Sequence, residues 1–347
     1  MNISKWTSLW KVIAVGAVVF MGLWGATAFA GPFDLLRENT CRLIRKKKQE
    51  QLAKLPKRFI MAASKVPGVR KSAGLHSLEF IVLGNPCQIN HALVLFHGRA
   101  PRHLGLFCLG TEKKGTKDRR AIEGELKSAN EGAIVLSVNS KVASWPGFSG
   151  DYHGQNGATI LALCHYLKRF NDKGQMKFHL GALGCGCRPL YSLFCHLRKS
   201  DGLCAKFLDC ELATVSDHDA CYTESMVSAY RWLIKRTKDV QVNFIHCGRP
   251  VFEMQRRIAC RFHSLSSHCA LPSYRSGDEK TYLRNRIRFW SSKSHALSLG
   301  GQLARAFFGI RKQEKRLCMS LQNGLKGKSE GNIIEEERIL RVDRKPL

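Results

Sequence analysis

Acidic side chains are scarce in this sequence, and their scarcity makes the protein strongly basic. The 347 residues include 27 Asp and Glu against 56 Lys and Arg, which gives a formal net charge of +29 at pH 7. The basic residues are spread along the whole chain. Such a surface attracts anions, so nucleic acid, anionic lipid and acidic cell-wall polymer are the partner classes to weigh against a solvated surface with no dedicated partner.

Metal-binding motifs and internal repeats are also missing. No CxxC…CxxC pair and no HExxH motif occurs, so we expect no metal ion and no other cofactor. Cys185 and Cys187 with a distant His form a weaker metal-binding alternative. All 14 cysteines follow residue 30, and in an oxidising compartment their even number would allow several disulfides. The chain is nevertheless not a small, cysteine-dense scaffold, and the single residue between Cys185 and Cys187 disfavours a bridge between them.

Long apolar runs are absent except at the N-terminus. Lys5 and Lys11 precede the apolar residues 12–30, which end in Ala-Phe-Ala before Gly31. A positive region, an apolar run and an A-x-A cleavage site predict a secretory signal at residues 1–30 and export to the periplasm or beyond. An uncleaved membrane anchor is the alternative, because the run is long enough to span a bilayer.

Beyond residue 30, short apolar segments alternate with segments of helical periodicity. The basic stretch 36–57 is interpreted as a helix with a solvated face, and 144–157 as a surface loop. The alternation predicts an α/β fold, with a mostly parallel, doubly wound sheet in three layers. The domains expected are a basic N-terminal extension at 31–75, the sheet domain at 76–308 and a charged C-terminal tail at 309–347. Strands are expected at 76–83, 92–96, 133–138, 176–183, 207–215 and 240–245, and helices at 119–129, 158–170, 224–235 and 296–308.

The chain is organised around residues 176–194, MKFHLGALGCGCRPLYSLF. An apolar strand ends at Leu183, Gly-Cys-Gly-Cys makes a tight turn at 184–187, and Pro189 suits the first turn of a helix. Strand, sharp turn and helix are the context of a nucleophile elbow, whose residues are small because the backbone is strained and another strand passes close. No serine stands in this turn.

Polar residues follow several other predicted strands. His97 and Gly98 follow the strand at 92–96, Asp217 and Asp219 follow the strand at 207–215, and His268 lies in a later Ser-rich loop. In wound parallel sheets the site forms outside the carboxyl ends of the strands. We therefore expect these segments to converge on one site.

At these residues the chain resembles the α/β-hydrolase superfamily, particularly its exported serine-hydrolase-like members, over roughly 76–272. VLFHGRA at 94–100 is similar to the strand and HG oxyanion loop, and FHLGALGCGCRPL at 178–190 is similar to a G-H-S-x-G-G elbow. SDHDACYTES at 216–225 is similar to the acid-bearing loop, and SSHCALP at 266–272 to the loop that brings the histidine. Nucleophile, acid and histidine thus follow in the order of the hydrolases.

The resemblance implies roles for individual residues. Gly184 takes the nucleophile position, and Cys185, one place later, is the nearest side chain able to attack a carbonyl. His268 would be the general base and Asp219 the acid that orients it. His263 is the fallback base and Asp217 the competing acid. The oxyanion would be bound by backbone N–H groups beside His97, Gly98 and Gly186.

Each of these residues also has a plainer interpretation. Cys185 as a small buried residue is favoured over Cys185 as nucleophile. Asp219 could cap the following helix, and His97 with Gly98 could form only a tight turn. Trp145 and Tyr152 either line a pocket or pack their own loop.

The sequence therefore predicts an exported, basic, α/β-hydrolase-like protein that hydrolyses an ester or amide by acyl transfer, impaired by the Gly at position 184. The substrate would be a small molecule or a polymer. The alternative is a non-catalytic pseudo-enzyme that binds an anionic envelope component such as a membrane or wall surface. A nucleic-acid partner is disfavoured, because only the charge supports it.

Overall fold

The computed structural model describes residues 30–98, 117–140, 142, 145–149, 154–171, 175–220, 223–260, 280–282 and 286–291. The chain divides into two units, which meet between Gln51 and Leu52. The described part of the first unit, residues 30–51, is most of the basic helix α2 (Ala30–Ala53). This helix overlaps the stretch 36–57 for which a helix was expected, but it begins six residues earlier and ends four residues earlier. No described helix is long and apolar enough to cross a membrane. The apolar run at 12–30 lies outside the described residues except for Ala30, the first residue of α2.

One sheet runs through the second unit. Its order over the described residues is β1-β2-β4-β3-β5-β6-β7-β9-β8. Every neighbouring pair from β4 to β9 is parallel, whereas β2 is antiparallel to β1 and β4, and β8 is antiparallel to β9. The strands are β1 (Arg58–Ala62), β2 (Leu75–Gly84), β3 (Ile89–Phe96), β4 (Gly132–Ser140), β5 (Lys177–Leu183), β6 (Leu212–His218), β7 (Gln241–His246), β8 (Lys280–Tyr282) and β9 (Ile287–Ser291).

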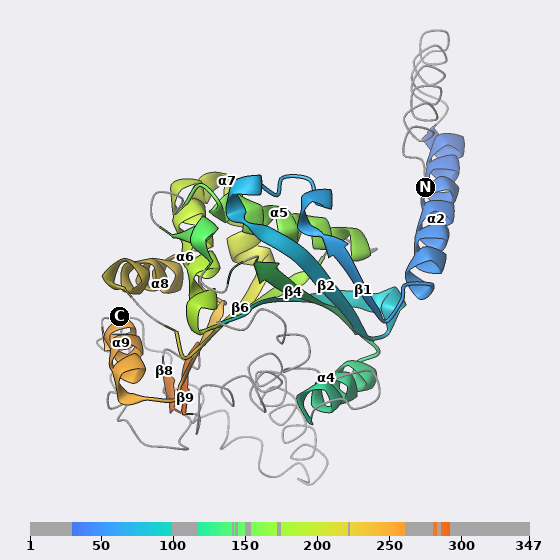
Figure 1. Cartoon of the computed structure of the whole chain (residues 1–347). Coiled ribbons are helices and arrows are strands. Elements are labelled where there is room, and N and C mark those ends of the chain that lie inside the picture. The colour runs from blue at the N-terminus through green and yellow to red at the C-terminus, as the bar shows by residue number, and fades with distance from the viewer. Residues whose placement is uncertain are drawn as a thin grey trace, which may run out of the picture. The chain divides into compact units, whose positions relative to one another are not determined.

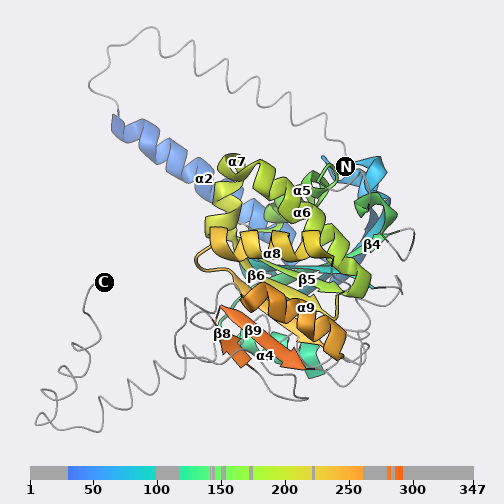
Figure 2. The ribbon, with the colours of Figure 1, turned by 90° about the vertical axis from the view of Figure 1, so that its left-hand side faces the viewer.

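Helices cover both faces of this sheet (Figures 1 and 2). Successive side chains of a strand point to opposite faces, so Val94 and Phe96 of β3 join one apolar cluster and Leu93 and Leu95 join another. The first cluster includes side chains from α5 (Gly157–Leu167), α6 (Cys187–Lys199), α8 (Glu224–Arg236) and α9 (Arg249–Cys260). The second includes Ile122 and Leu126 of α4 (Lys117–Ser128). The predicted three-layer α/β fold with a mostly parallel sheet is confirmed.

The sheet unit begins earlier in the chain than expected. Residues 52–75 belong to it, although the sequence placed them in the basic extension. β1 pairs with β2, and Phe59 stacks on Phe80 with ring centroids 4.6 Å apart. The 3₁₀ turns η1 (Ala63–Lys65) and η2 (Lys71–Ala73) bury one alanine each. The basic residues of this segment are exposed, while most of its apolar residues pack into the core at this edge of the sheet.

Two local expectations were wrong. The segment interpreted as a surface loop buries Trp145 and Phe148 completely, and a Cβ on Gly147 would lie 2.4 Å from the carbonyl oxygen of Ser72. Its glycines and serines suggested a surface loop, but its aromatic rings take it into the core. The strand expected from residue 207 begins only at Leu212, because Phe207–Glu211 forms a π-helical turn after α7 (Asp201–Lys206).

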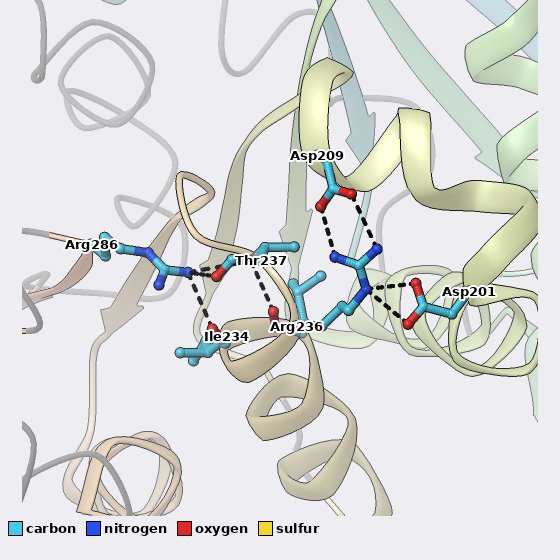
Figure 3. Close-up of polar contacts among 7 residues, drawn as sticks. Asp201, Asp209, Ile234, Arg236, Thr237 and Arg286 are labelled. Carbon is cyan, nitrogen blue, oxygen red and sulfur yellow. Dashed lines mark hydrogen bonds and ion pairs between the residues drawn. The ribbon is translucent and has the colours of Figure 1, made fainter.

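Two arginines hold the C-terminal end of α8 (Figure 3). Arg236 donates to both carboxylate oxygens of Asp201 at 2.6 and 2.8 Å and also to Asp209 at 2.7 Å, which lowers the pKa of Asp209. Arg286, just before β9, donates to the carbonyl oxygens of Ile234 at 3.2 Å and Thr237 at 2.5 Å. The last carbonyls of a helix have no partner within it, so Arg286 supplies hydrogen bonds that α8 itself does not.

Arg286→Ala is expected to lower the free energy of unfolding by about 2 kcal/mol, because the carbonyl oxygens at the end of α8 would lose a charged donor. Arg286→Lys should recover less than half of that loss, since an ammonium does not reproduce the planar fork. Arg249→Ala is the control: its 77 % exposed side chain is 3.9 Å from Glu253. Urea unfolding measures all three, and equal midpoints for Arg286→Ala and Arg249→Ala would refute the capping role.

Candidate functional site

The chain makes a sharp bend after β5. Leu183 is still extended, Gly184 has a φ of 52°, and the 3₁₀ turn η7 (Gly184–Gly186) leads directly into α6. A φ in this left-handed region costs a residue with a Cβ roughly 1–2 kcal/mol. The strained position of the bend is therefore Gly184, the residue that the resemblance aligns with the nucleophile.

The bend lies against the end of β3. A Cβ on Gly186 would lie 2.4 Å from the carbonyl oxygen of Phe96 and 2.8 Å from that of His97, so no side chain fits there. A Cβ on Gly98 would come within 3.2 Å of the carbonyl oxygen of Leu183. The two segments proposed to bind an oxyanion are therefore neighbours.

His97 is fixed by hydrogen bonds on both ring nitrogens. Nδ1 is 2.6 Å from the carbonyl oxygen of Gly98, and Nε2 is 3.2 Å from the backbone nitrogen of Ser140, which donates to it. Nε2 is thus an acceptor and Nδ1–H a donor, and burial lowers the pKa of His97. Trp145 Nε1 donates to the carbonyl oxygen of His97 at 2.8 Å. His97 is therefore a neutral residue that holds this corner of the sheet, and Trp145 packs against it.

Cys185 does not stand at the apex of the bend. It is a half-buried thiol that packs against the large apolar cluster, whereas the favoured interpretation was a buried residue. The histidines proposed as its base, His268 and His263, lie outside the described residues, as does Tyr152. Cys187 is fully buried at the start of α6.

Asp219 joins the ends of β6 and β7. Its φ is 51°, and its N–H donates to the carbonyl oxygen of Ile245 at 2.6 Å. One carboxylate oxygen accepts from the backbone N–H of Cys247 at 3.2 Å, and the other from the Cys247 thiol at 2.7 Å. The helix-capping alternative for Asp219 is wrong, because Thr223 caps α8 and accepts from Met226 N–H.

Asp217 lies within the core. It is fully buried, and the hydroxyl of Tyr230 on α8 donates to its carboxylate at 2.5 Å. Since Tyr230 belongs to the apolar cluster beneath α8, this carboxylate lies between the sheet and that helix. Of the two acids weighed, Asp219 is the one held at the strand ends.

Two residues at the end of β7 were assigned no role from the sequence. Burial, with the hydrogen bond to Asp219, raises the pKa of the Cys247 thiol to about 12. Burial lowers the pKa of His246 to about 4, although Asp219 and Gln255 act in the opposite sense. The signal that located Asp219, polar residues directly after a buried strand, would also have located His246 and Cys247.

Lowering the pH from about 7.5 to about 5 is expected to destabilise the protein by about 2 kcal/mol through His246. Below the ordinary histidine pKa of 6.5, His246 is protonated in the unfolded chain. In the folded chain His246 stays neutral until the pH falls to about 4. Stability is therefore lost as the pH falls between these values. Urea unfolding at both pH values should show a smaller loss for His246→Gln, and an equal loss in both proteins would exclude His246 as the source.

No family model matches the chain, and no curated protein matches it. Among solved structures, it is similar to Thermogutta terrifontis esterase 2 phosphorylated by paraoxon, at 12 % identity and a TM-score of 0.37, over 69 % of this chain and 83 % of that one. Est1E from Butyrivibrio proteoclasticus is similar at 9 % identity and a TM-score of 0.27, over 52 % and 80 %. A membrane phospholipase A described as a bacterial virulence factor is similar at 9 % and 0.32, over 92 % and 100 %.

The architecture itself defines the class. A mostly parallel sheet wound on both faces, with a sharp glycine bend between a central strand and a helix, is the architecture expected of an α/β-hydrolase-like fold.

Proposed function

We propose that this chain has an α/β-hydrolase-like fold without a nucleophile at its elbow, and that it binds an anionic envelope component without hydrolysing it. One observation carries the first part. Gly184 has the left-handed backbone of the apex and no side chain, while Cys185 packs against the core one position later. The net charge of +29 supports the second part. Residues 1–30 would export the protein or anchor it in a membrane.

Weak ester or amide hydrolysis through Cys185 is the second candidate, favoured by the partial exposure of this thiol and by the closeness of Gly98 and Gly186. Cys185 would attack the carbonyl, and His268 would take its proton while Asp219 fixed the tautomer. His268 would then pass this proton to the departing alcohol or amine, whose bond to the acyl carbon breaks. Backbone N–H groups of the bend would bind the oxyanion, and water would then release the acyl group. Asp219 already binds the Cys247 thiol and N–H, which competes with this role.

Hydrolysis of short-chain aryl esters separates the two candidates. Wild type, Cys185→Ala and His268→Ala should give the same background rate, because no side chain at the apex forms an acyl-enzyme. Cys195→Ala, which removes another half-buried cysteine from α6, is the matched control. A loss of about tenfold or more in Cys185→Ala and His268→Ala, but not in Cys195→Ala, would establish hydrolysis and overturn the proposal.

A further inference from the structure

Helix α2 exposes apolar side chains among lysines. Leu43 is 61 % exposed and Ile44 is 55 % exposed, and both lie mid-helix. Lys46 and Lys47 follow three and four positions after Leu43 and are exposed as well. Residues at these spacings are neighbours on a helix surface. The middle of α2 thus presents a compact patch of two apolar and two cationic side chains, which we call the 43–47 patch.

The segment around this patch is strongly basic. Residues 41–57 include seven Lys or Arg and one acidic residue, Glu50. The patch therefore fits a partner that is both anionic and able to take up apolar side chains.

We propose that the 43–47 patch docks α2 on the surface of an anionic phospholipid bilayer. Leu43 and Ile44 would enter the boundary between headgroups and acyl chains, while Lys46 and Lys47 would meet lipid phosphates. Wall polymer and nucleic acid would match the lysines but offer no apolar layer for Leu43 and Ile44. In the sequence, α2 follows directly on the apolar run at 12–30, the segment expected to meet a membrane.

This inference rests on the proposed binding of an anionic component, and it names the surface of the chain that binds and the partner that is bound.

The test compares the full chain on phosphatidylcholine vesicles with and without phosphatidylglycerol. Wild type should prefer the anionic vesicles, and added salt should weaken that preference. Lys46→Gln with Lys47→Gln should lower it about 30-fold. The matched control is Lys65→Gln with Lys71→Gln, which removes two exposed lysines from the sheet unit and should change it less than about threefold.

The apolar part of the patch has its own control. Leu43→Gln with Ile44→Gln should lower binding to anionic vesicles about tenfold or more. Ile60→Gln, which changes a 63 % exposed residue of β1, should leave it unchanged.

The outcomes separate this inference from the proposed function. If both lysine pairs lowered the preference for anionic vesicles equally, the whole cationic surface would bind the vesicles. That result would overturn the 43–47 patch as the docking site and leave the proposed function standing. Binding to wall polymer or nucleic acid but not to anionic vesicles would overturn the lipid as partner. Absence of binding to every anionic surface would overturn both.

Discussion

Replacing Gly186 with alanine is expected to lower the free energy of unfolding by at least about 3 kcal/mol. The added Cβ would lie 2.4 Å from one backbone carbonyl oxygen and 2.8 Å from a second, at Phe96 and His97. Backbone atoms in the middle of a sheet do not move aside as a flexible side chain does. The bend would have to separate from β3, and the contact between the two segments would be lost.

Gly202→Ala is the matched control for this substitution. Gly202 lies in α7, and no heavy atom would lie within 4 Å of its added Cβ. Alanine in a helix should then stabilise the protein by up to about 1 kcal/mol. Both variants are compared with wild type by urea unfolding. If Gly186→Ala stayed within about 1 kcal/mol of wild type, the close approach of the bend to β3 would be refuted.

Gly184→Ser is expected to raise aryl-ester hydrolysis about 100-fold above the wild-type background. The new hydroxyl would stand at the apex of the bend, where the backbone already has the strained conformation of an elbow. Serine should cost about 1–2 kcal/mol of stability at a φ of 52°. The gain would show that the rest of the site is still arranged for acyl transfer.

Two controls bear on this gain of activity. Gly184→Ala introduces the same backbone strain without a hydroxyl and should remain inactive. Adding His268→Ala to Gly184→Ser should return the rate to background, because the serine would lose the general base proposed for it. A Gly184→Ser protein that folds and hydrolyses no faster than Gly184→Ala would contradict the assignment of Gly184 to the nucleophile position.

The centre of the sheet could be predicted from the sequence because its strands are buried on both faces. β3 and β4 contain the apolar runs 92–96 and 133–136, and the strands expected at 92–96 and 133–138 lie within these two strands. The glycine bend could also be predicted, because the small residues of 184–187 are required where the chain turns close to the backbone of another strand.

The edges of the fold were harder to predict. β1 has only five residues and alternates between exposed and half-buried positions, and β9 buries a charged side chain, Arg288. β9 therefore lacks the continuous apolar run that identifies a central strand, and the run of β1 at 59–62 is only four residues long. α9 was missed because its arginines obscure the apolar positions at Phe252 and Ile258.

The site could be predicted only in outline. The rule that polar residues follow buried strands located His97, the bend and Asp219 on the carboxyl side of the sheet. It did not indicate that Asp219 binds the Cys247 thiol, since that contact joins residues 28 positions apart through the pairing of β6 with β7. Nor did it indicate that both ring nitrogens of His97 form hydrogen bonds to the backbone, at Gly98 and Ser140.

The central claim is that the elbow carries no nucleophile, and acyl mapping tests it most directly. Wild-type protein is incubated with p-nitrophenyl acetate, quenched and digested, and the acetyl groups on its cysteines are located by mass spectrometry. We predict that Cys185 is acetylated no more than Cys195, the half-buried cysteine of α6. Stoichiometric acetylation of Cys185 that disappears in His268→Ala would contradict the claim and identify the protein as a cysteine-dependent hydrolase.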